Sequence, residues 1–146
     1  MAHASKSIVV NVTPEQFFTV LVDYQKYPEF LPEVKKTIVE GQPPDALVHY
    51  TIDIKAKNIS YTVQMKADPG KKLSWAMTKG EMMKENKGAW TLKVVPAGTE
   101  ATYDIELKLG ALVPSFIEKA LAETSLPTML ANFKARAEKL FPKAVA

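Results

Sequence analysis

Five stretches between Leu47 and Leu109 alternate apolar and polar residues one by one, and this period of two constrains the fold more than any other feature. Such regular alternation predicts an antiparallel sheet with one face exposed to solvent and the other covered by the rest of the protein. The residues expected to point inward are Val48, Tyr50, Ile52 and Ile54; Ile59, Tyr61, Val63 and Met65; Leu73, Trp75 and Met77; Trp90, Leu92 and Val94; and Ala101, Tyr103, Ile105, Leu107 and Leu109.

The breaks between these stretches are short and contain turn-forming residues. KAKN, DPGKK and PAGTE suit hairpin turns, and Gly70 and Gly98 are able to take positive φ. GQPPDA and KGEMMKENKG are expected to be longer connections. Upstream, SKSIVVNV predicts a further strand through Ile8, Val10 and Val12.

Two segments with helical spacing bracket the predicted strands. Thr13, Pro14 and Gln16 have the pattern of an N-cap, a proline at the first helical position and a capping box. Pro127 must either kink the second helical segment or begin a new helix after Ser125. The apolar residues at helical spacing are Phe17, Phe18, Leu21 and Val22 in the first segment, and Leu126, Met129, Leu130, Phe133, Ala137 and Leu140 in the second.

The expected inward face is rich in aromatic residues with polar tips, accompanied by methionines. Such residues suit a cavity with apolar walls and a few hydrogen-bonding groups, but they suit a filled core equally well, and composition alone favours the core. Met82 and Met83 raise a similar choice, between a gate or membrane-contacting tip and a pair of which one points into the core. We favour the core for one of this pair.

Composition excludes several classes of function. The chain has no cysteine, so disulfides and thiolate chemistry are excluded, and 47% hydrophobic with 24% charged residues is an ordinary globular balance. The net charge of +3 comes from scattered lysines, and Arg136 is the only arginine, which gives no support to DNA binding. Arg136 is expected to be a surface residue paired with a carboxylate. No apolar run is long enough to span a bilayer and no targeting peptide is recognised, so we expect a cytoplasmic protein.

The residues that could carry catalysis are few. His3 is expected in a frayed terminus, and His49 alternates onto the polar face of its strand. Asp53, Asp104 and Glu106 also alternate outward, away from any acid–base site. No metal-binding or nucleotide-binding motif is present, so we expect no metal, no cofactor and no assigned catalytic residue.

The order of the predicted elements, together with YPEFLPEVKK, GAWTL, GTEATYDIELKL and LPTMLANFKARAEKL, resembles the START-like, helix-grip superfamily. Within it the resemblance is to the branch of polyketide cyclases/dehydrases, coenzyme Q-binding proteins and the ribosome-association toxin. The most specific part is Asp23, Tyr27, Pro28, Phe30, Leu31 and Pro32, followed later by Gly88, Trp90 and Leu92.

This resemblance implies a single α+β domain over residues 1–146, in which a curved antiparallel sheet of about six or seven strands wraps around a long C-terminal helix. It also implies two short helices after the first strand, the second begun by Pro28 and ended by Pro32, with Tyr27, Phe30 and Leu31 at the end wall of a cavity. A direct ligand contact by Tyr27 or Phe30 is the alternative.

We therefore predict a small binding protein for a hydrophobic molecule that is lipid-like, isoprenoid or aromatic. A cyclase or dehydratase acting on a polyketide-like substrate, assisted by tyrosine hydroxyls, is one alternative, and a regulator that contacts the ribosome or another protein is the other. The oligomeric state is left open. The predicted ligand-binding residues are Tyr50, Ile52, Tyr61, Val63, Met65, Trp75, Met77, Trp90, Tyr103, Ile105, Met129, Leu130 and Phe133.

Overall fold

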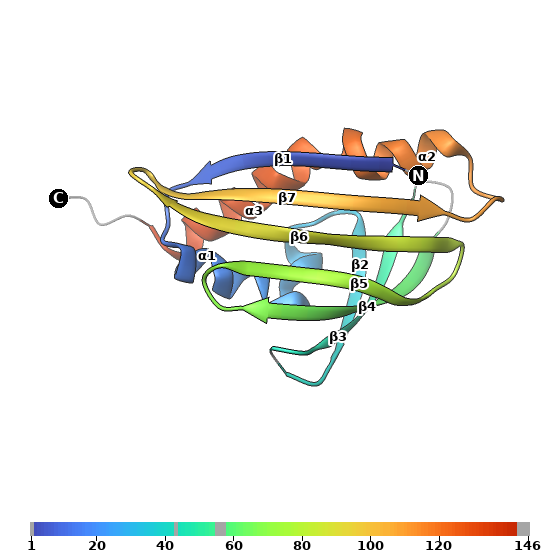
Figure 1. Cartoon of the computed structure of the whole chain (residues 1–146), viewed down its shortest axis with the longest axis horizontal. Helices are drawn as coiled ribbons and strands as arrows, with labels where there is room; N and C mark the ends of the chain where they lie inside the picture. Colours follow the sequence, from blue (N-terminus) through green and yellow to red (C-terminus); the bar gives the residue numbers. More distant parts are fainter. Residues whose placement is uncertain (1, 43, 55–57, 143–146) are drawn as a thin grey trace.

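A seven-stranded antiparallel sheet in the order β1-β7-β6-β5-β4-β3-β2 forms the body of the protein in the computed structural model, which describes residues 2–42, 44–54 and 58–142 (Figure 1). The elements are β1 (Ala2–Val10), α1 (Pro14–Leu21), the 3₁₀ helix η1 (Tyr24–Glu29), β2 (Val34–Glu40), β3 (Leu47–Asp53), β4 (Asn58–Asp68), β5 (Lys72–Gly80), β6 (Met83–Val95), β7 (Gly98–Leu109), α2 (Ser115–Lys119), the π-helical turn η2 (Ala120–Thr124) and α3 (Leu126–Leu140). The predicted α+β helix-grip architecture is thus confirmed.

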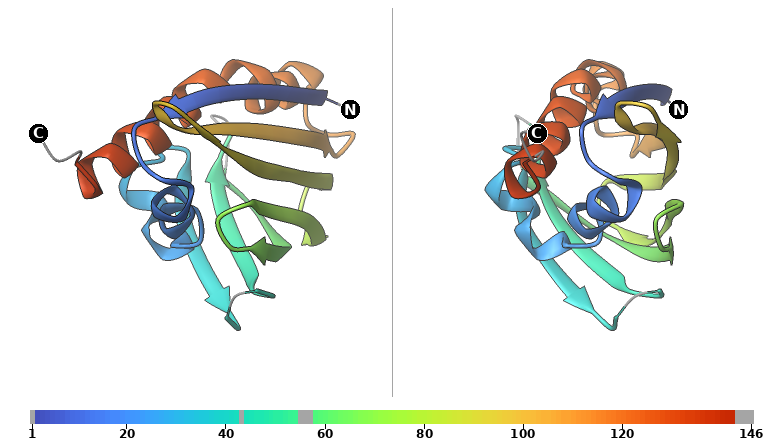
Figure 2. Two further views of the ribbon diagram at one scale, coloured as in Figure 1. Left: turned by 60° about the vertical axis from the view of Figure 1, so that its left-hand side comes forward. Right: turned by 90° about the vertical axis from the view of Figure 1, so that its left-hand side faces the viewer.

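The sheet is strongly curved, and the helices occupy the inner side of the curve. In Figure 2 the strands bend from β1 round to β2, and α3 closes the open side between these two edges. The face that turns toward α1 and α3 carries the alternating apolar residues, and most of those predicted to point inward are buried. The covered face predicted from the period of two is therefore the core of the protein.

The helix boundaries follow from local chemistry. The Gln16 N–H donates to Thr13 Oγ1 at 3.1 Å and the Thr13 N–H donates to Gln16 Oε1 at 3.0 Å, which confirms the capping box. The C-terminal helical segment is interrupted at η2, and α3 begins at Leu126 with Pro127 in its first turn. Of the two predicted outcomes, a kink or a new helix after Ser125, the structure shows the new helix.

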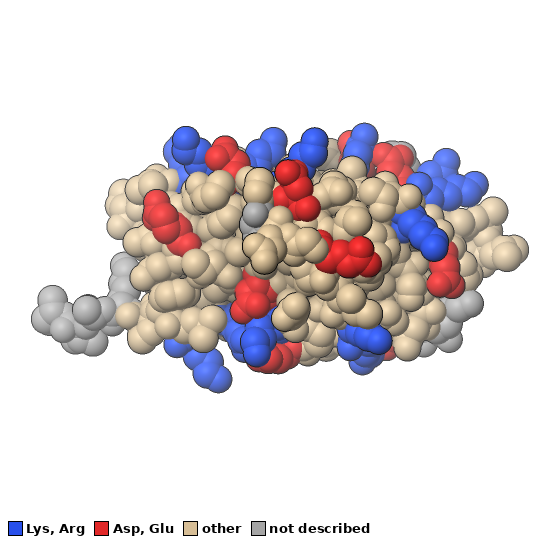
Figure 3. All heavy atoms as spheres, turned by 90° about the horizontal axis from the view of Figure 1, so that it is seen from below, with Lys and Arg blue, Asp and Glu red and all other residues tan. Residues whose placement is uncertain are grey.

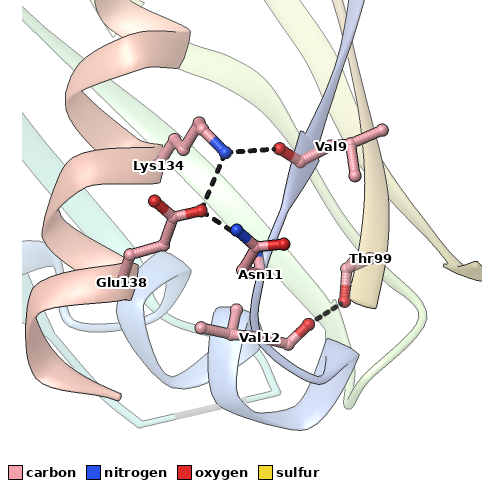
Figure 4. A network of polar contacts seen from close by, with 6 residues as sticks. All are labelled: Val9, Asn11, Val12, Thr99, Lys134 and Glu138. Atoms are coloured by element: carbon pink, nitrogen blue, oxygen red, sulfur yellow. Dashed lines mark hydrogen bonds and ion pairs between the residues drawn. The ribbon is translucent and has the colours of Figure 1, made fainter. Parts of the chain in front are cut away.

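A polar network fastens the end of α3 to the chain between β1 and α1 (Figure 4). The Lys134 Nζ donates to the Val9 carbonyl oxygen at 2.9 Å and to Glu138 Oε2 at 2.8 Å, and the Asn11 N–H donates to the same carboxylate oxygen at 3.0 Å. Close by, Thr99 Oγ1 donates to the carbonyl oxygen of Val12 at 2.7 Å. These bonds hold one end of α3 against the edge of the sheet that β1 forms.

Three predicted connections agree with the structure and one does not. Gly70 (φ 74°) and Gly98 (φ 139°) lie in the hairpins predicted for DPGKK and PAGTE. A longer connection separates Glu40, the end of β2, from Leu47, the start of β3, as predicted for GQPPDA. KGEMMKENKG is not a long loop, because β5 runs to Gly80 and β6 begins at Met83. Met82, at φ 55°, makes the turn, and a positive φ at a non-glycine residue gave no signal in the sequence. The KAKN turn involves residues 55–57, which lie outside the described part.

Three further expectations are corrected. Val94 is 72% exposed, because the last residues of β6 extend to the hairpin with β7, past the covered part of the sheet. His3 lies within β1, opposite Glu106 of β7, and is not in a frayed terminus. Pro28 does not begin the second short helix, since η1 starts at Tyr24 and contains Pro28 near its end. Within the described ranges, no helix combines the length and the apolar character needed to cross a bilayer.

Candidate ligand cavity

A cavity of about 140 Å³ lies between the inner face of the sheet and the segment from η2 to α3. Strands β3 to β7 contribute to its wall, and the residues around η1 and the start of β2 form another part of the wall. The core is therefore neither completely filled nor widely hollow. Of the two alternatives, a filled core and a cavity, the structure shows a packed core that also contains a cavity large enough for a small molecule.

Most of the residues predicted from alternation and helical spacing line this cavity. Met77 and Leu130 do not line it. Leu130 is buried elsewhere in the core, and Met77 lies on β5 directly before the irregularity in the pairing of β4 and β5. The predicted residues that line the cavity are Tyr50, Ile52, Tyr61, Val63, Met65, Trp75, Trp90, Tyr103, Ile105, Met129 and Phe133.

Tyr27 and Leu31 lie in the lining, as expected for an end wall, whereas Phe30 does not. Met83 is buried and lines the cavity. The prediction that one of Met82 and Met83 points into the core is therefore confirmed. Sequence reasoning missed Glu33 and Asn86, because Glu33 follows a proline in a connection and Asn86 was placed in a loop. The other lining residues that were not predicted as ligand-binding are Val34, Leu73, Leu107, Leu121, Ser125 and Leu126.

An aromatic cluster fills the end of the core next to the cavity. The ring of Phe133, on α3, lies 5.1 Å from Trp90, 5.4 Å from Tyr27 and 5.1 Å from Phe30, centroid to centroid. Phe17 of α1 packs edge-on against Trp90 at 5.5 Å. These edge-to-face contacts are favourable for aromatic pairs. Three of the rings, those of Tyr27, Trp90 and Phe133, form an aromatic part of the cavity wall.

Trp75 occupies its position because β6 has a glycine beneath it. A Cβ at Gly88 would lie 2.7 Å from Trp75 Cζ2 and 2.2 Å from the carbonyl oxygen of Asp104, so any side chain at position 88 would force β6 or the indole to move. The indole N–H of Trp75 donates to Asn86 Oδ1 at 3.0 Å, which satisfies its polar atom inside the protein. The Trp75 ring lies 5.5 Å from that of Tyr103.

Four tyrosine hydroxyls belong to the cavity wall, and their protonation state follows from burial. Burial raises the pKa of Tyr27, Tyr50, Tyr61 and Tyr103 well above the usual tyrosine value of 10.0. The negative charge of Glu33 raises the pKa of Tyr61 and Tyr103 further, whereas a hydrogen bond with Asn86 lowers that of Tyr61. At neutral pH these hydroxyls are protonated and serve as hydrogen-bonding groups, not as bases.

The hydroxyls differ in their partners. The Tyr27 hydroxyl donates to the carbonyl oxygen of Leu21, which fixes η1 against the end of α1. In the described part of the chain, no hydrogen bond joins the Tyr50 or Tyr103 hydroxyl to another protein group, and the Tyr50 ring stacks on that of Tyr61 at 5.1 Å. The cavity therefore offers hydroxyls that a ligand can use. The described residues include no cluster of histidine, aspartate and glutamate able to hold a metal ion.

The model of one protein family matches residues 1–138 of this chain, which is nearly its whole length; the family is described as polyketide cyclase / dehydrase and lipid transport. The chain belongs to this family. Its START-like, helix-grip fold is the one that the sequence resemblance implied.

Similar proteins agree with this membership. The ribosome association toxin RatA of Vibrio cholerae is 29% identical over 111 residues, which cover 75% of this chain and 74% of RatA. Among solved structures, the ZhuI aromatase/cyclase of Streptomyces sp. R1128 has a TM-score of 0.76 at 16% identity and covers 94% of each chain. A START superfamily protein of Mycobacterium smegmatis has a TM-score of 0.80 at 17% identity and covers 94% of this chain and 98% of its own. The structural likenesses carry the fold alone.

Proposed function

We propose that this protein binds a small hydrophobic ligand in the cavity between the sheet and α3. The supporting observation is the lining, which combines aliphatic side chains and aromatic rings with the hydroxyls of Tyr50 and Tyr103. The volume of about 140 Å³ matches a molecule about as large as one aromatic ring, since an apolar cavity of about 150 Å³ in another protein admits benzene.

A larger lipid-like, isoprenoid or aromatic ligand requires the lining to move. Met65, Met83 and Met129 lie in the lining, and unbranched methionine side chains adapt to irregular shapes at low cost. Lipid transport in the family description is consistent with an apolar ligand of this kind. The residues proposed to contact it are those predicted from the sequence that line the cavity, together with Tyr27, Glu33 and Asn86.

The test uses the tryptophans of the protein itself. The chain has two tryptophans, Trp75 and Trp90, and both line the cavity, so their fluorescence reports on its occupancy. We expect toluene, a neutral one-ring probe, to change this fluorescence saturably. Native mass spectrometry of the freshly purified protein then shows whether a small molecule is retained.

A matched pair of variants localises the effect. Ser125 is half-buried in the lining, so Ser125→Leu fills part of the cavity and should weaken toluene binding strongly. Ser115→Leu makes the same change at an exposed position at the start of α2, away from the lining, and should leave binding unchanged. Absence of a saturable signal in the unaltered protein, or an equal loss in both variants, would contradict the proposal.

A cyclase or dehydratase activity is the second candidate, favoured by the tyrosine hydroxyls that converge on the cavity. Such hydroxyls can donate hydrogen bonds to a carbonyl oxygen of a folded chain, although their raised pKa values exclude them as general bases at neutral pH. Under this proposal, Tyr50→Phe or Tyr103→Phe would abolish turnover of a polyketide-like substrate while binding persists. Loss of binding together with turnover would argue for a simple binding role.

Association with the ribosome is the third candidate, and the similarity to RatA is the observation that favours it. In Figure 3 the visible face carries basic side chains interspersed with carboxylates, so any electrostatic attraction to RNA from this face would be weak. Co-sedimentation with ribosomal subunits at low salt that vanishes at moderate salt would support the proposal. Failure to co-sediment at any salt concentration would count against it.

A further inference from the structure

Glu33 places a negatively charged side chain in the wall of the cavity. It lies just before β2, is half-buried, and is the only charged residue among the described residues that line the cavity. Its side chain makes no hydrogen bond and no ion pair with any described residue. A carboxylate that faces a cavity without a protein partner is an acceptor available to a ligand.

Among the described residues that line the cavity, aromatic rings accompany Glu33 and no side chain carries a positive charge. Glu33, Tyr61 and Tyr103 all line this cavity, and the negative charge of Glu33 raises the pKa of both tyrosines. Trp75 packs against Tyr103, and its indole N–H is already bonded to Asn86. No lysine, arginine or histidine occurs among the described lining residues. Aromatic faces attract cations, and a lone carboxylate repels anions.

We propose, on the basis of the binding function above, that the ligand carries a protonated amine next to its apolar body, and that this amine binds Glu33. The apolar part of the ligand then lies against the aromatic residues of the lining, such as Tyr61, Trp75 and Tyr103. Because Glu33 is only half-buried, the ammonium group keeps part of its hydration while the ring enters the cavity, which limits the desolvation cost. A ligand carboxylate of the same size would meet the like charge of Glu33 and, among the described lining residues, no positively charged partner.

Three probes of nearly equal size separate charge from shape: phenethylamine, 2-phenylethanol and 3-phenylpropionate. Tryptophan fluorescence at neutral pH and low salt gives the dissociation constant of each. We expect phenethylamine to bind about tenfold more tightly than the alcohol, as a charge-assisted hydrogen bond provides. The carboxylate should bind most weakly of the three.

Substitution of Glu33 tests the assignment to this residue. Glu33→Gln keeps the shape of the side chain and removes its charge, so the amine and the alcohol should then bind equally. Glu33→Asp keeps the charge and should preserve the order of the three probes. Glu123→Gln is the matched control, because Glu123 is exposed on η2, lies outside the lining and undergoes the same loss of charge.

The outcomes distinguish this inference from the proposed function. Equal binding of the three probes, preference for the carboxylate, or an amine preference that survives Glu33→Gln would overturn the role of Glu33. If toluene binds but none of the charged probes does, the cavity binds ligands and the amine proposal is wrong. If neither toluene nor any of the three probes binds, the proposed function itself fails.

Discussion

Arg136 Nη2 donates a hydrogen bond to Glu29 Oε1 at 3.0 Å, and the guanidinium carbon of Arg136 lies 5.3 Å from the centre of the Phe30 ring. The only arginine of the chain thus joins α3 to η1, the short helix that carries Tyr27 into the cavity wall. The expectation that Arg136 pairs with a carboxylate at the surface is confirmed.

This pair should make stability depend on pH in the acid range. The hydrogen bond from Arg136 is the main reason why the pKa of Glu29 is lowered, so its contribution is present above the unfolded-state pKa and is lost as the pH falls through the lowered value. Arg136→Ala should lower the midpoint of thermal unfolding at neutral pH, and the difference from the unaltered protein should shrink as Glu29 becomes protonated. A difference that stays constant at acid pH would show that the ion pair does not contribute.

The tyrosines should titrate abnormally in the folded protein. All five have a raised pKa, caused first by burial, and that of Tyr24 is raised to about 12. Their raised pKa values contribute stability that is present below the unfolded-state value of 10.0 and is lost as the pH rises toward the folded-state values. The absorbance of tyrosinate should therefore stay low just above pH 10.0 and should rise only when the protein unfolds. Circular dichroism measures this unfolding in the same pH titration. Early titration of several tyrosines in folded protein would contradict this prediction.

Gly88→Ala should destabilise the protein and disturb Trp75. The added Cβ would lie 2.2 Å from the carbonyl oxygen of Asp104 and 2.7 Å from Trp75 Cζ2, so either β6 or the indole must move. Overpacking of this kind costs about 1–3 kcal/mol, which urea unfolding would detect. Gly110→Ala is the control, because its nearest contact would be 3.4 Å, and its effect should be clearly smaller. Equal effects of the two substitutions would contradict this account.

Phe133→Ala should lower the stability of the protein and enlarge the cavity. Phe133 is 2% exposed and packs against Phe17, Tyr27, Phe30 and Trp90, so its loss should cost about 3–5 kcal/mol of unfolding free energy. The enlarged cavity should admit naphthalene, which the unaltered protein should bind more weakly than toluene.

The exposed Phe116 provides the control for this prediction. Phe116→Ala removes a side chain that is 72% exposed and should change stability by no more than about 0.5 kcal/mol. A variant at Phe133 that is destabilised yet gains no affinity for naphthalene would show that the core collapses into the space.

Much of the cavity wall could be predicted because one face of each strand is buried. Tyr50, Val63 and Ile105 alternate with polar neighbours, and a period of two leaves them only one face to share. Val94 obeys the same alternation but lies past the covered part of the sheet, since periodicity records the direction of a side chain and not whether another element covers it.

The sequence by itself determined the order of the elements, the covered face of the sheet and the start of α1, because alternation, capping and proline act over a few neighbouring residues. Only the tertiary structure decided that Glu33 and Asn86 face the cavity, that Met77 and Leu130 do not, and that about 140 Å³ stays unfilled. These properties depend on how far the curved sheet stands from α3. That separation is set by contacts between residues distant in the chain, such as Phe133 with Trp90 and Lys134 with Val9, which no local pattern encodes.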